Sequence, residues 1–209
     1  MADIRSRLYK KYVSGFKGDV YKKMNNEMFQ VKKINARFGD YLKPYKNAKI
    51  LELGCGAGFL LKYLKTEGFT DFVGVDVSGE QIAIAKREEL PAIEADASNF
   101  LTNHPNTFDV VIAIDFIEHF TKDEIFSIIG KIKSSLSSNG LVIFQTPNGA
   151  GWMPGRIVWG DLTHMTIFTP GSINQLLKLF GFKEVKFKET GPFPGGLYRW
   201  LRIIGWNIF

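Results

Sequence analysis

The sequence is poor in several features that define whole classes of protein. It contains one cysteine in 209 residues, which excludes a disulfide framework and a cysteine-rich zinc site. It contains no run of about 18 apolar residues, so we expect no transmembrane helix. Residues 1–7 carry no apolar segment of the kind that forms a secretory signal, so we expect none and we expect a cytoplasmic protein.

Acidic residues are scarce at the N-terminal end. Residues 1–49 hold 13 Lys and Arg against 4 Asp and Glu, whereas the remaining 160 residues hold 14 against 17. The excess positive charge therefore belongs to the N-terminal segment. It is either an arm that meets an acidic partner, a membrane surface or a phosphorylated substrate, or the solvated face of a helix. The body carries no basic stripe, so a nucleic-acid partner is not favoured.

The composition is otherwise that of a globular protein, with 45% hydrophobic and 23% charged residues, which excludes a disordered or collagenous chain. Apolar residues recur at helical spacing over residues 19–42, and Pro44 is expected to end this helix. Residues 1–44 are therefore interpreted as a basic helical extension.

Residues 45–190 alternate between strand and helix patterns. The expected strands are 49–53, 72–75, 92–95, 108–114, 141–145 and 185–188, and the expected helices are 59–65, 79–87, 123–136 and 172–180. Such alternation predicts an α/β domain: a Rossmann-like, doubly wound, mostly parallel sheet with helices on both faces. Ligands of such sheets bind beyond the carboxyl ends of the strands, where the strand order reverses.

Residues 191–209 depart from this pattern. A Pro- and Gly-rich linker is followed by apolar residues at helical spacing, namely Leu197, Trp200, Leu201, Ile204 and Ile208. Three interpretations stay open: this amphipathic helix packs on the body, or it contacts a membrane or a protein partner, or the chain is cut short.

A glycine loop follows the first strand of the α/β domain. Gly54, Gly56 and Gly58 let the backbone turn sharply and let a ligand approach it closely. The dinucleotide fingerprint requires Gly-x-Gly-x-x-Gly, and Phe59 breaks that spacing. The carboxylate of Glu52, two residues before the first glycine, would also repel a pyrophosphate.

Two further strand ends carry carboxylates. Asp76 lies 22 residues after Gly54 and can accept hydrogen bonds from both hydroxyls of a ribose. Asp96 ends the third strand and could accept from an adenine amino group. The set suits a positively charged nucleoside without phosphates. The plainer alternatives are a carboxylate at a helix N-terminus for Asp76, a surface turn for Asp96, and a small residue that fits the loop for Cys55.

Five segments occur in a family's order: ILELGCGAGF, VGVDVS, EADA, FDVVIAIDFIEHF and GLVIFQTPN. With them the sequence resembles the class I S-adenosylmethionine-dependent methyltransferases over roughly residues 45–190. It is most similar to the ubiquinone-biosynthesis type and to small-molecule or sugar O-methyltransferases. The resemblance implies S-adenosylmethionine as cofactor and S-adenosylhomocysteine as product. The family's usual final antiparallel strand is not evident, because the tail has a helical pattern.

The resemblance also implies roles for single residues. The loop around the methionine part of the cofactor would comprise Glu52, Gly54, Cys55, Gly56 and Gly58. The remaining cofactor-binding residues would be Asp76 with Val77 at the ribose, Asp96 with Ala97 at the adenine, and Asp115 with Phe116 near the sulfonium.

The sequence motifs that would bind the methyl acceptor are less distinctive than those for the cofactor. The fourth-strand end lacks the [Asn/Asp]-Pro-Pro-[Tyr/Phe] sequence of exocyclic-amine methyltransferases and the Pro-Cys pair used for carbon methylation of pyrimidines. It offers His119 instead, and a later segment offers His164. Imidazole suits general-base removal of a hydroxyl proton, and we favour His164 over His119; the alternative for each is a structural role. The loop residues Trp152, Arg156 and Trp159 would suit a sugar ring, or an apolar ring with an acidic group.

The function that these patterns favour is methyl transfer to a hydroxyl of a small molecule or of a sugar or glycan precursor. The alternatives are a non-catalytic S-adenosylmethionine-binding module that contacts a partner or a membrane surface, and a nucleotide-cofactor oxidoreductase, which Phe59 disfavours. Metal-capable residue types cluster near the acceptor side, namely Asp115, Glu118, His119, Asp161 and His164. Such side chains need no metal at a cofactor-side loop, so we predict no metal.

Overall fold

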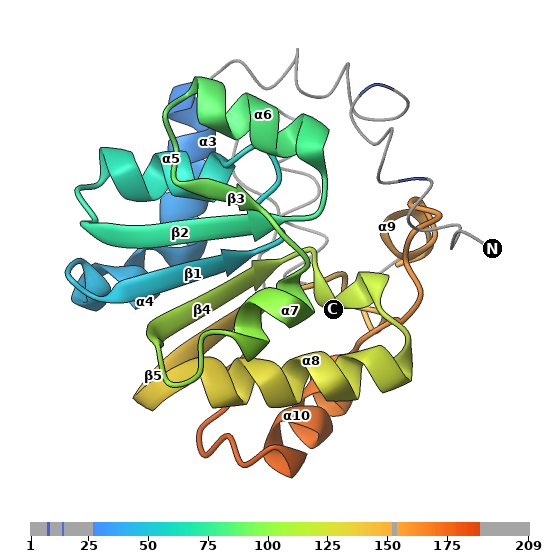
Figure 1. Cartoon of the computed structure of the whole chain (residues 1–209). Coiled ribbons are helices and arrows are strands. Elements are labelled where there is room, and N and C mark those ends of the chain that lie inside the picture. Colours follow the sequence, from blue (N-terminus) through green and yellow to red (C-terminus); the bar gives the residue numbers. More distant parts are fainter. Residues whose placement is uncertain (1–7, 9–13, 15–26, 152–153, 189–209) are drawn as a thin grey trace.

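A sheet of five parallel strands forms the centre of the structure, a computed structural model that describes Leu8, Ser14 and residues 27–151 and 154–188 (Figure 1). The strands are β1 (Lys49–Leu53), β2 (Asp71–Asp76), β3 (Ala92–Glu94), β4 (Phe108–Ile114) and β5 (Leu136–Gln145). Their order is β3-β2-β1-β4-β5, and every neighbouring pair is parallel. The predicted α/β class is confirmed.

Helices cover both faces of this sheet (Figure 1). The helices that do so are α3 (Glu27–Ile34), α5 (Phe59–Thr66), α6 (Gly79–Arg87), α7 (Ala97–Thr102), α8 (Lys122–Ser135) and α10 (Pro170–Leu179). The short helix α9 (Gly155–Val158) lies apart from the sheet, beyond the ends of the strands (Figure 1). Four short turns of helix accompany them: η2 (Asn35–Gly39), α4 (Asp40–Leu42), η3 (Lys43–Tyr45) and η4 (Ile117–His119).

The central strands are buried on both sides, as their continuous apolar sequences predict. Leu51 and Leu53 of β1 belong to the core cluster that contains α8 and α10 residues, whereas Ile50 belongs to a second cluster with Leu60 and Leu64 of α5. Successive residues of one strand point to opposite faces, so β1 anchors both helical layers.

The helix ends follow from local sequence. A capping box between Thr121 and Glu124 begins α8, and a second one between Thr169 and Ser172 begins α10. Ser78 is the N-cap of α6, but its side chain makes no capping hydrogen bond. Its backbone N–H donates to Asp76 Oδ1 instead, at 2.8 Å.

One predicted strand is wrong. Residues 182–188 form no strand, although residues 185–188 have an alternating apolar pattern. Val185 packs against the core, which accounts for its apolar character, and the Lys188 ammonium donates to the Ala36 carbonyl at 3.5 Å. Phe187, the other apolar residue of the pattern, is 51% exposed, so the two residues do not share a buried face.

Two other segments differ from expectation in part. The N-terminal helix predicted over residues 19–42 is described from Glu27 onward, where it is α3 followed by the π-helical η2 and by α4, and Pro44 lies in η3. Residues 191–209, predicted to be a linker and an amphipathic helix, lie outside the described residues, so that prediction stands as a prediction. None of the helices in the described ranges combines the length and hydropathy that a membrane span requires.

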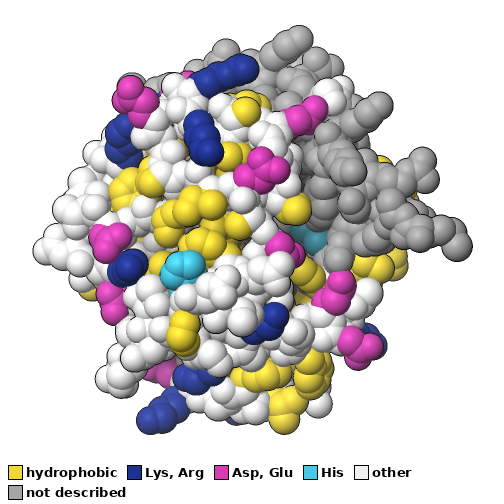
Figure 2. All heavy atoms as spheres, viewed as in Figure 1, with side chains coloured by type: hydrophobic (Ala, Val, Ile, Leu, Met, Phe, Trp, Pro, Cys, Tyr) yellow, Lys and Arg dark blue, Asp and Glu magenta, His cyan; other side chains and the backbone are white. Residues whose placement is uncertain are grey.

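The charged side chains described on one face of the molecule are mixed in sign. Figure 2 shows Lys and Arg interspersed with Asp and Glu over this face, without a broad patch of either charge. This agrees with the balance of charge in the body of the sequence. It gives no footprint for a polyanion on this face.

Candidate active site

The strand order places the site. The chain runs outward from β1 to β2 and β3, and then crosses to β4 and β5 on the other side of β1. The order therefore reverses between β1 and β4, and the crevice of such a sheet lies beyond the carboxyl ends of these two strands. The glycine loop leaves β1 there, and the turn that begins at Asp115 leaves β4 beside it (Figure 1).

The three glycines of the loop are required by its shape. Gly54, Gly56 and Gly58 have φ angles of +70°, +54° and +84°, in the left-handed region that L side chains rarely adopt. A Cβ at Gly54 would lie 2.8 Å from a ring carbon of Phe116. The loop after β1 and the turn after β4 are therefore in contact. This is a requirement of the prediction that the loop glycines and Phe116 bind the same cofactor.

Asp76 connects the loop to the end of β2. Its Oδ2 accepts the Gly56 backbone N–H at 2.9 Å, and its Oδ1 accepts the Ser78 N–H at 2.8 Å. Burial raises the pKa of Asp76, while the backbone donors of Ser78, Gly56 and Val77 oppose that rise. The side chain of Val77 is 54% exposed at the strand tip, where a flat ligand could pack on it.

Glu52 lies beneath the loop, and its carboxyl group is only partly hydrogen-bonded. Its side chain is 4% exposed, and Oε2 has no hydrogen-bond partner among the described residues. Burial and the charge of Asp76 raise the pKa of Glu52 well above its usual range. A buried acid in this state is stabilised by a cationic or hydrogen-bond-donating ligand.

Cys55 fits its plainer interpretation. Its side chain is buried, and a Cβ at Gly74 would lie 2.6 Å from the Cys55 Cβ, so the space around it is tight. Burial, Glu52 and Asp76 all raise the pKa of the Cys55 thiol. The thiol therefore stays protonated and is a poor nucleophile.

Asp96 and Ala97 begin a helix that sequence reasoning missed. Asp96 is the N-cap of α7, and its Oδ1 accepts the Asn99 N–H at 2.9 Å. Ala97 packs partly against the core. The available signal was an Asp followed by a short apolar pattern, which is a common helix start. A structural role thus exists for Asp96 beside the predicted adenine contact.

The tip of β4 contains a short network of polar groups. Asp115 has a φ of +48°, and its N–H donates to the Gln145 carbonyl at 2.8 Å. The Gln145 Nε2 donates to Asp115 Oδ1 at 3.1 Å, and Arg37 Nη1 donates to Gln145 Oε1 at 3.1 Å. Phe116 packs edge-on against Phe120, with ring centroids 4.8 Å apart. Sequence reasoning did not anticipate Arg37 or Gln145 in this site.

The two candidate histidines meet beyond this tip. The His119 and His164 ring centroids are 5.0 Å apart. His164 Nδ1 lies 2.8 Å from the Val158 carbonyl oxygen, so in the neutral ring Nδ1 carries the proton and Nε2 keeps the lone pair. His119 Nδ1 lies 2.9 Å from Thr163 Oγ1, and that hydroxyl donates to Asp161 Oδ1 at 2.6 Å.

This arrangement orients the His119 ring from behind. The Thr163 hydroxyl donates its hydrogen bond to Asp161. Its oxygen is therefore free only to accept, and it accepts a hydrogen bond from His119 Nδ1–H. Burial lowers the pKa of His119, and the charge of a protonated His164 lowers it further. Burial also acts to raise the pKa of Asp161, but the Thr163 hydrogen bonds and both histidines outweigh it, so that pKa is lowered. The Asp161–Thr163 pair was not anticipated as a support for His119.

Glu118 completes the cluster. It is 2% exposed, and neither carboxyl oxygen meets hydrogen-bond geometry with another described residue. Ligand atoms of Glu118, His119 and His164 all lie within 4.8 Å of one another, so the three side chains could hold a divalent cation. The expectation that no metal is used stays a prediction.

The pKa of Glu118 makes a prediction about stability. Burial and Asp115 raise it to about 8, against an ordinary value of 4.5. Between these two values the native state binds a proton that the unfolded state has lost, so stability falls as the pH rises through this window. Glu118→Gln removes the titration, so we expect the variant to be more stable than wild type at pH 8, by about 1–3 kcal/mol, with the difference shrinking toward pH 5.

Urea unfolding at both pH values measures this difference. The exposed Glu184→Gln variant, on the segment after α10, is the matched control and should show no such pH-dependent gain. An equal effect of Glu118→Gln at pH 5 and pH 8 would contradict a raised pKa.

The predicted acceptor loop is described only in part. Trp152 and the side chain of Arg156 lie outside the described residues, although Arg156 itself falls within α9. Trp159 follows that helix and is 72% exposed. Its ring is available to a ligand or to a partner, and its contact with the acceptor stays a prediction.

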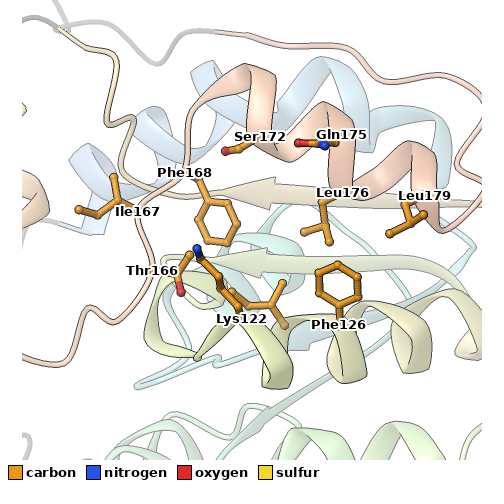
Figure 3. A pocket seen from close by; sticks show the side chains of 10 residues that line it. Lys122, Phe126, Thr166, Ile167, Phe168, Ser172, Gln175, Leu176 and Leu179 are labelled. Atoms are coloured by element: carbon orange, nitrogen blue, oxygen red, sulfur yellow. The ribbon is translucent and has the colours of Figure 1, made fainter.

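A separate cavity of about 390 Å³ lies between α8 and α10 (Figure 3). Phe126 of α8 and Leu176 and Leu179 of α10 line its apolar part, and Lys122, Ser172 and Gln175 provide polar groups. Its lining includes none of the residues predicted for the cofactor or the acceptor.

Comparison with known proteins places this geometry in context. Residues 23–186 match a family profile described as a methyltransferase domain. The chain is 30% identical over 122 residues to a ubiquinone biosynthesis O-methyltransferase of Pelagibacter ubique, which covers 56% of this chain and 49% of that relative. The chain thus spans about half the length of this relative.

Solved structures agree on the fold. A SAM-dependent methyltransferase from Archaeoglobus fulgidus has a TM-score of 0.68 at 24% identity and covers 75% of this chain and 71% of its own. A protein from Pyrococcus horikoshii has a TM-score of 0.66 at 23% identity and covers 86% of this chain and 94% of its own. At these identities the likeness is evidence for the fold alone.

Proposed function

Since the chain belongs to the methyltransferase-domain family of class I S-adenosylmethionine-dependent methyltransferases, we propose that it transfers the methyl group of S-adenosylmethionine to a hydroxyl of a small molecule. The observation that carries the proposal is the contact between Asp76 and the glycine loop. Through this contact the Asp76 carboxylate, which is of the kind that binds a ribose, lies beside the glycine loop and the buried Glu52 at the carboxyl ends of β1 and β2.

The same residues argue against a dinucleotide. A pyrophosphate would need backbone N–H groups at a helix N-terminus with no carboxylate nearby. Here Asp76 accepts the N–H of Gly56, and Glu52 lies beneath the loop. The α-ammonium and sulfonium charges of S-adenosylmethionine would instead be attracted by these carboxylates.

The acceptor side supports oxygen as the target atom. Methyl transfer is an in-line displacement, so positioning is its main requirement, but a hydroxyl must also lose its proton. The Nε2 lone pair of His164 can take that proton, because Nδ1 is held by the Val158 carbonyl. That the acceptor is a sugar or glycan precursor stays a prediction, which rests on the aromatic residues of the loop, the basic N-terminal segment and the resemblance to sugar O-methyltransferases.

A non-catalytic cofactor-binding module is the second candidate. It would need the glycine loop and Asp76 but not the paired histidines. The support that Thr163 and Asp161 give to His119 is more than cofactor binding requires, and this favours an enzyme.

Titration calorimetry tests the proposal at its first step. We expect S-adenosylmethionine and S-adenosylhomocysteine to bind and NAD not to bind. Tight binding of NAD without any response to S-adenosylhomocysteine would reject the proposal. A screen of hydroxylated acceptors with S-adenosylhomocysteine formation as the readout then separates the enzyme from the binding module.

A further inference from the structure

The N-terminal extension contains a π-helical turn, η2, next to the candidate active site. Such turns are rare and are often found at functional sites. The Tyr63 hydroxyl donates to Asn35 Oδ1 at 3.0 Å, and a side chain at Gly39 would collide with the Asn35 amide. Asn35 and Gly39 are the first and last residues of this turn, and Arg37 is its central residue.

From this position Arg37 contacts a residue that is distant in the sequence. Its Nη1 donates to Gln145 Oε1 at 3.1 Å, across 108 positions of sequence. Gln145 Nε2 donates to Asp115 Oδ1 at 3.1 Å, so the amide of Gln145 is fixed at both of its ends. Without the guanidinium, the amide could rotate and turn its oxygen toward the Asp115 carboxylate, which would repel it.

The backbone conformation of Asp115 depends on contacts with its neighbours. It is a non-glycine residue with a φ of +48°, a conformation that persists only where neighbouring contacts maintain it. Its carboxylate is exposed at the strand tip, and Gln145 supplies contacts to both its backbone and its side chain. Burial lowers the pKa of Arg37, and the negative charge of Asp115 opposes that shift. The guanidinium and the carboxylate therefore attract each other across the Gln145 amide.

We propose that Arg37 is a positioning residue, which acts through Gln145 to hold the Asp115 carboxylate in the orientation that meets the sulfonium end of the cofactor. The inference rests on the proposed function, because the place of Asp115 beside the sulfonium comes from the family. It assigns a task in the active site to one positive charge of the N-terminal segment.

A double-mutant cycle tests the proposal. Arg37→Met, Asp115→Asn and the double variant are compared with wild type by titration calorimetry against S-adenosylmethionine and S-adenosylhomocysteine. We expect Arg37→Met to weaken S-adenosylmethionine binding about fivefold and S-adenosylhomocysteine binding less, because the neutral thioether has no charge for Asp115 to meet. In the Asp115→Asn background, Arg37→Met should cost less than about twofold.

Lys43→Met is the matched control. It removes a positive charge from the same extension, where Lys43 forms only an exposed ion pair with Asp40 at 3.6 Å, and binding should not change. Arg37→Lys keeps the charge without the planar fork, and we expect it to recover part of the loss for S-adenosylmethionine. If Arg37→Met does not fold, Arg37→Lys takes its place in the cycle.

Additive losses in the double variant, or equal losses for the two ligands, would overturn the proposal and leave Arg37 a purely structural role. Failure of the wild-type protein to bind either ligand would instead reject the proposed function itself. The two failures are therefore distinguishable.

Discussion

The Asp76→Ala variant is expected to bind S-adenosylhomocysteine about 2–4 kcal/mol more weakly than wild type, which is roughly 30-fold to 1,000-fold in Kd. The carboxylate would accept from the two ribose hydroxyls, and each charge-assisted hydrogen bond contributes about 1.5–3 kcal/mol. The variant also loses the bond from Asp76 Oδ2 to the Gly56 N–H, so the glycine loop loses a support. Titration calorimetry measures the change.

Asp71→Ala is the matched control for this experiment. Asp71 lies on the same strand, at its opposite end, and its side chain is exposed. It should leave Kd unchanged. A loss below about 0.5 kcal/mol in Asp76→Ala would mean that Asp76 is not the ribose ligand. Asp76→Asn keeps the shape without the charge, and we expect it to lie between alanine and wild type.

The second large effect is expected on turnover. His164→Ala should lower kcat by about 10²-fold to 10⁴-fold while cofactor binding stays unchanged, because a general base acts on the acceptor alone. The measurement follows S-adenosylhomocysteine formation once an acceptor is in hand.

His104→Ala controls for loss of a histidine elsewhere. Its ring stacks on Phe100 with centroids 4.2 Å apart, away from the cluster, so turnover should be near wild type. Chelation should not lower wild-type turnover, since a cation on Nε2 of His164 would remove the base. If both His119→Ala and His164→Ala keep near-full turnover, neither histidine acts as the base, and the acceptor is an amine or proximity alone suffices.

The regular part of the fold was predictable because its signals are local. The strands over residues 49–53 and 108–114 were predicted with their observed bounds, since each is a short apolar run between turn residues. The Asn139-Gly140 pair lies inside β5 as an irregularity, with Asn139 at a φ of +64°. The false strand at residues 185–188 shows that alternation by itself establishes neither strand pairing nor a buried face, because Val185 is partly buried and Phe187 is 51% exposed.

Sequence spacing could select the glycines and Asp76 as candidates, because the loop and the strand end have a fixed separation. The hydrogen bond from the Gly56 N–H to Asp76 shows that these residues lie together, and their part in cofactor binding stays a prediction. Arg37 was not found, because no local pattern indicates which basic residue of the extension reaches Gln145. Glu118 was noted only as a residue type, since the burial that raises its pKa arises only in the folded chain.

The short length of β3 affects whether copies of the protein can associate by pairing strands in concentrated solution. It is one outer strand of the sheet and has only three residues, Ala92–Glu94. Pro91 before it has no N–H to offer a passing chain, and Glu94 ends it with an exposed charge. An outer strand this short and this charged is a poor template for intermolecular strand addition. This edge of the sheet therefore resists strand-to-strand association, whereas the opposite edge is formed by the ten-residue strand β5.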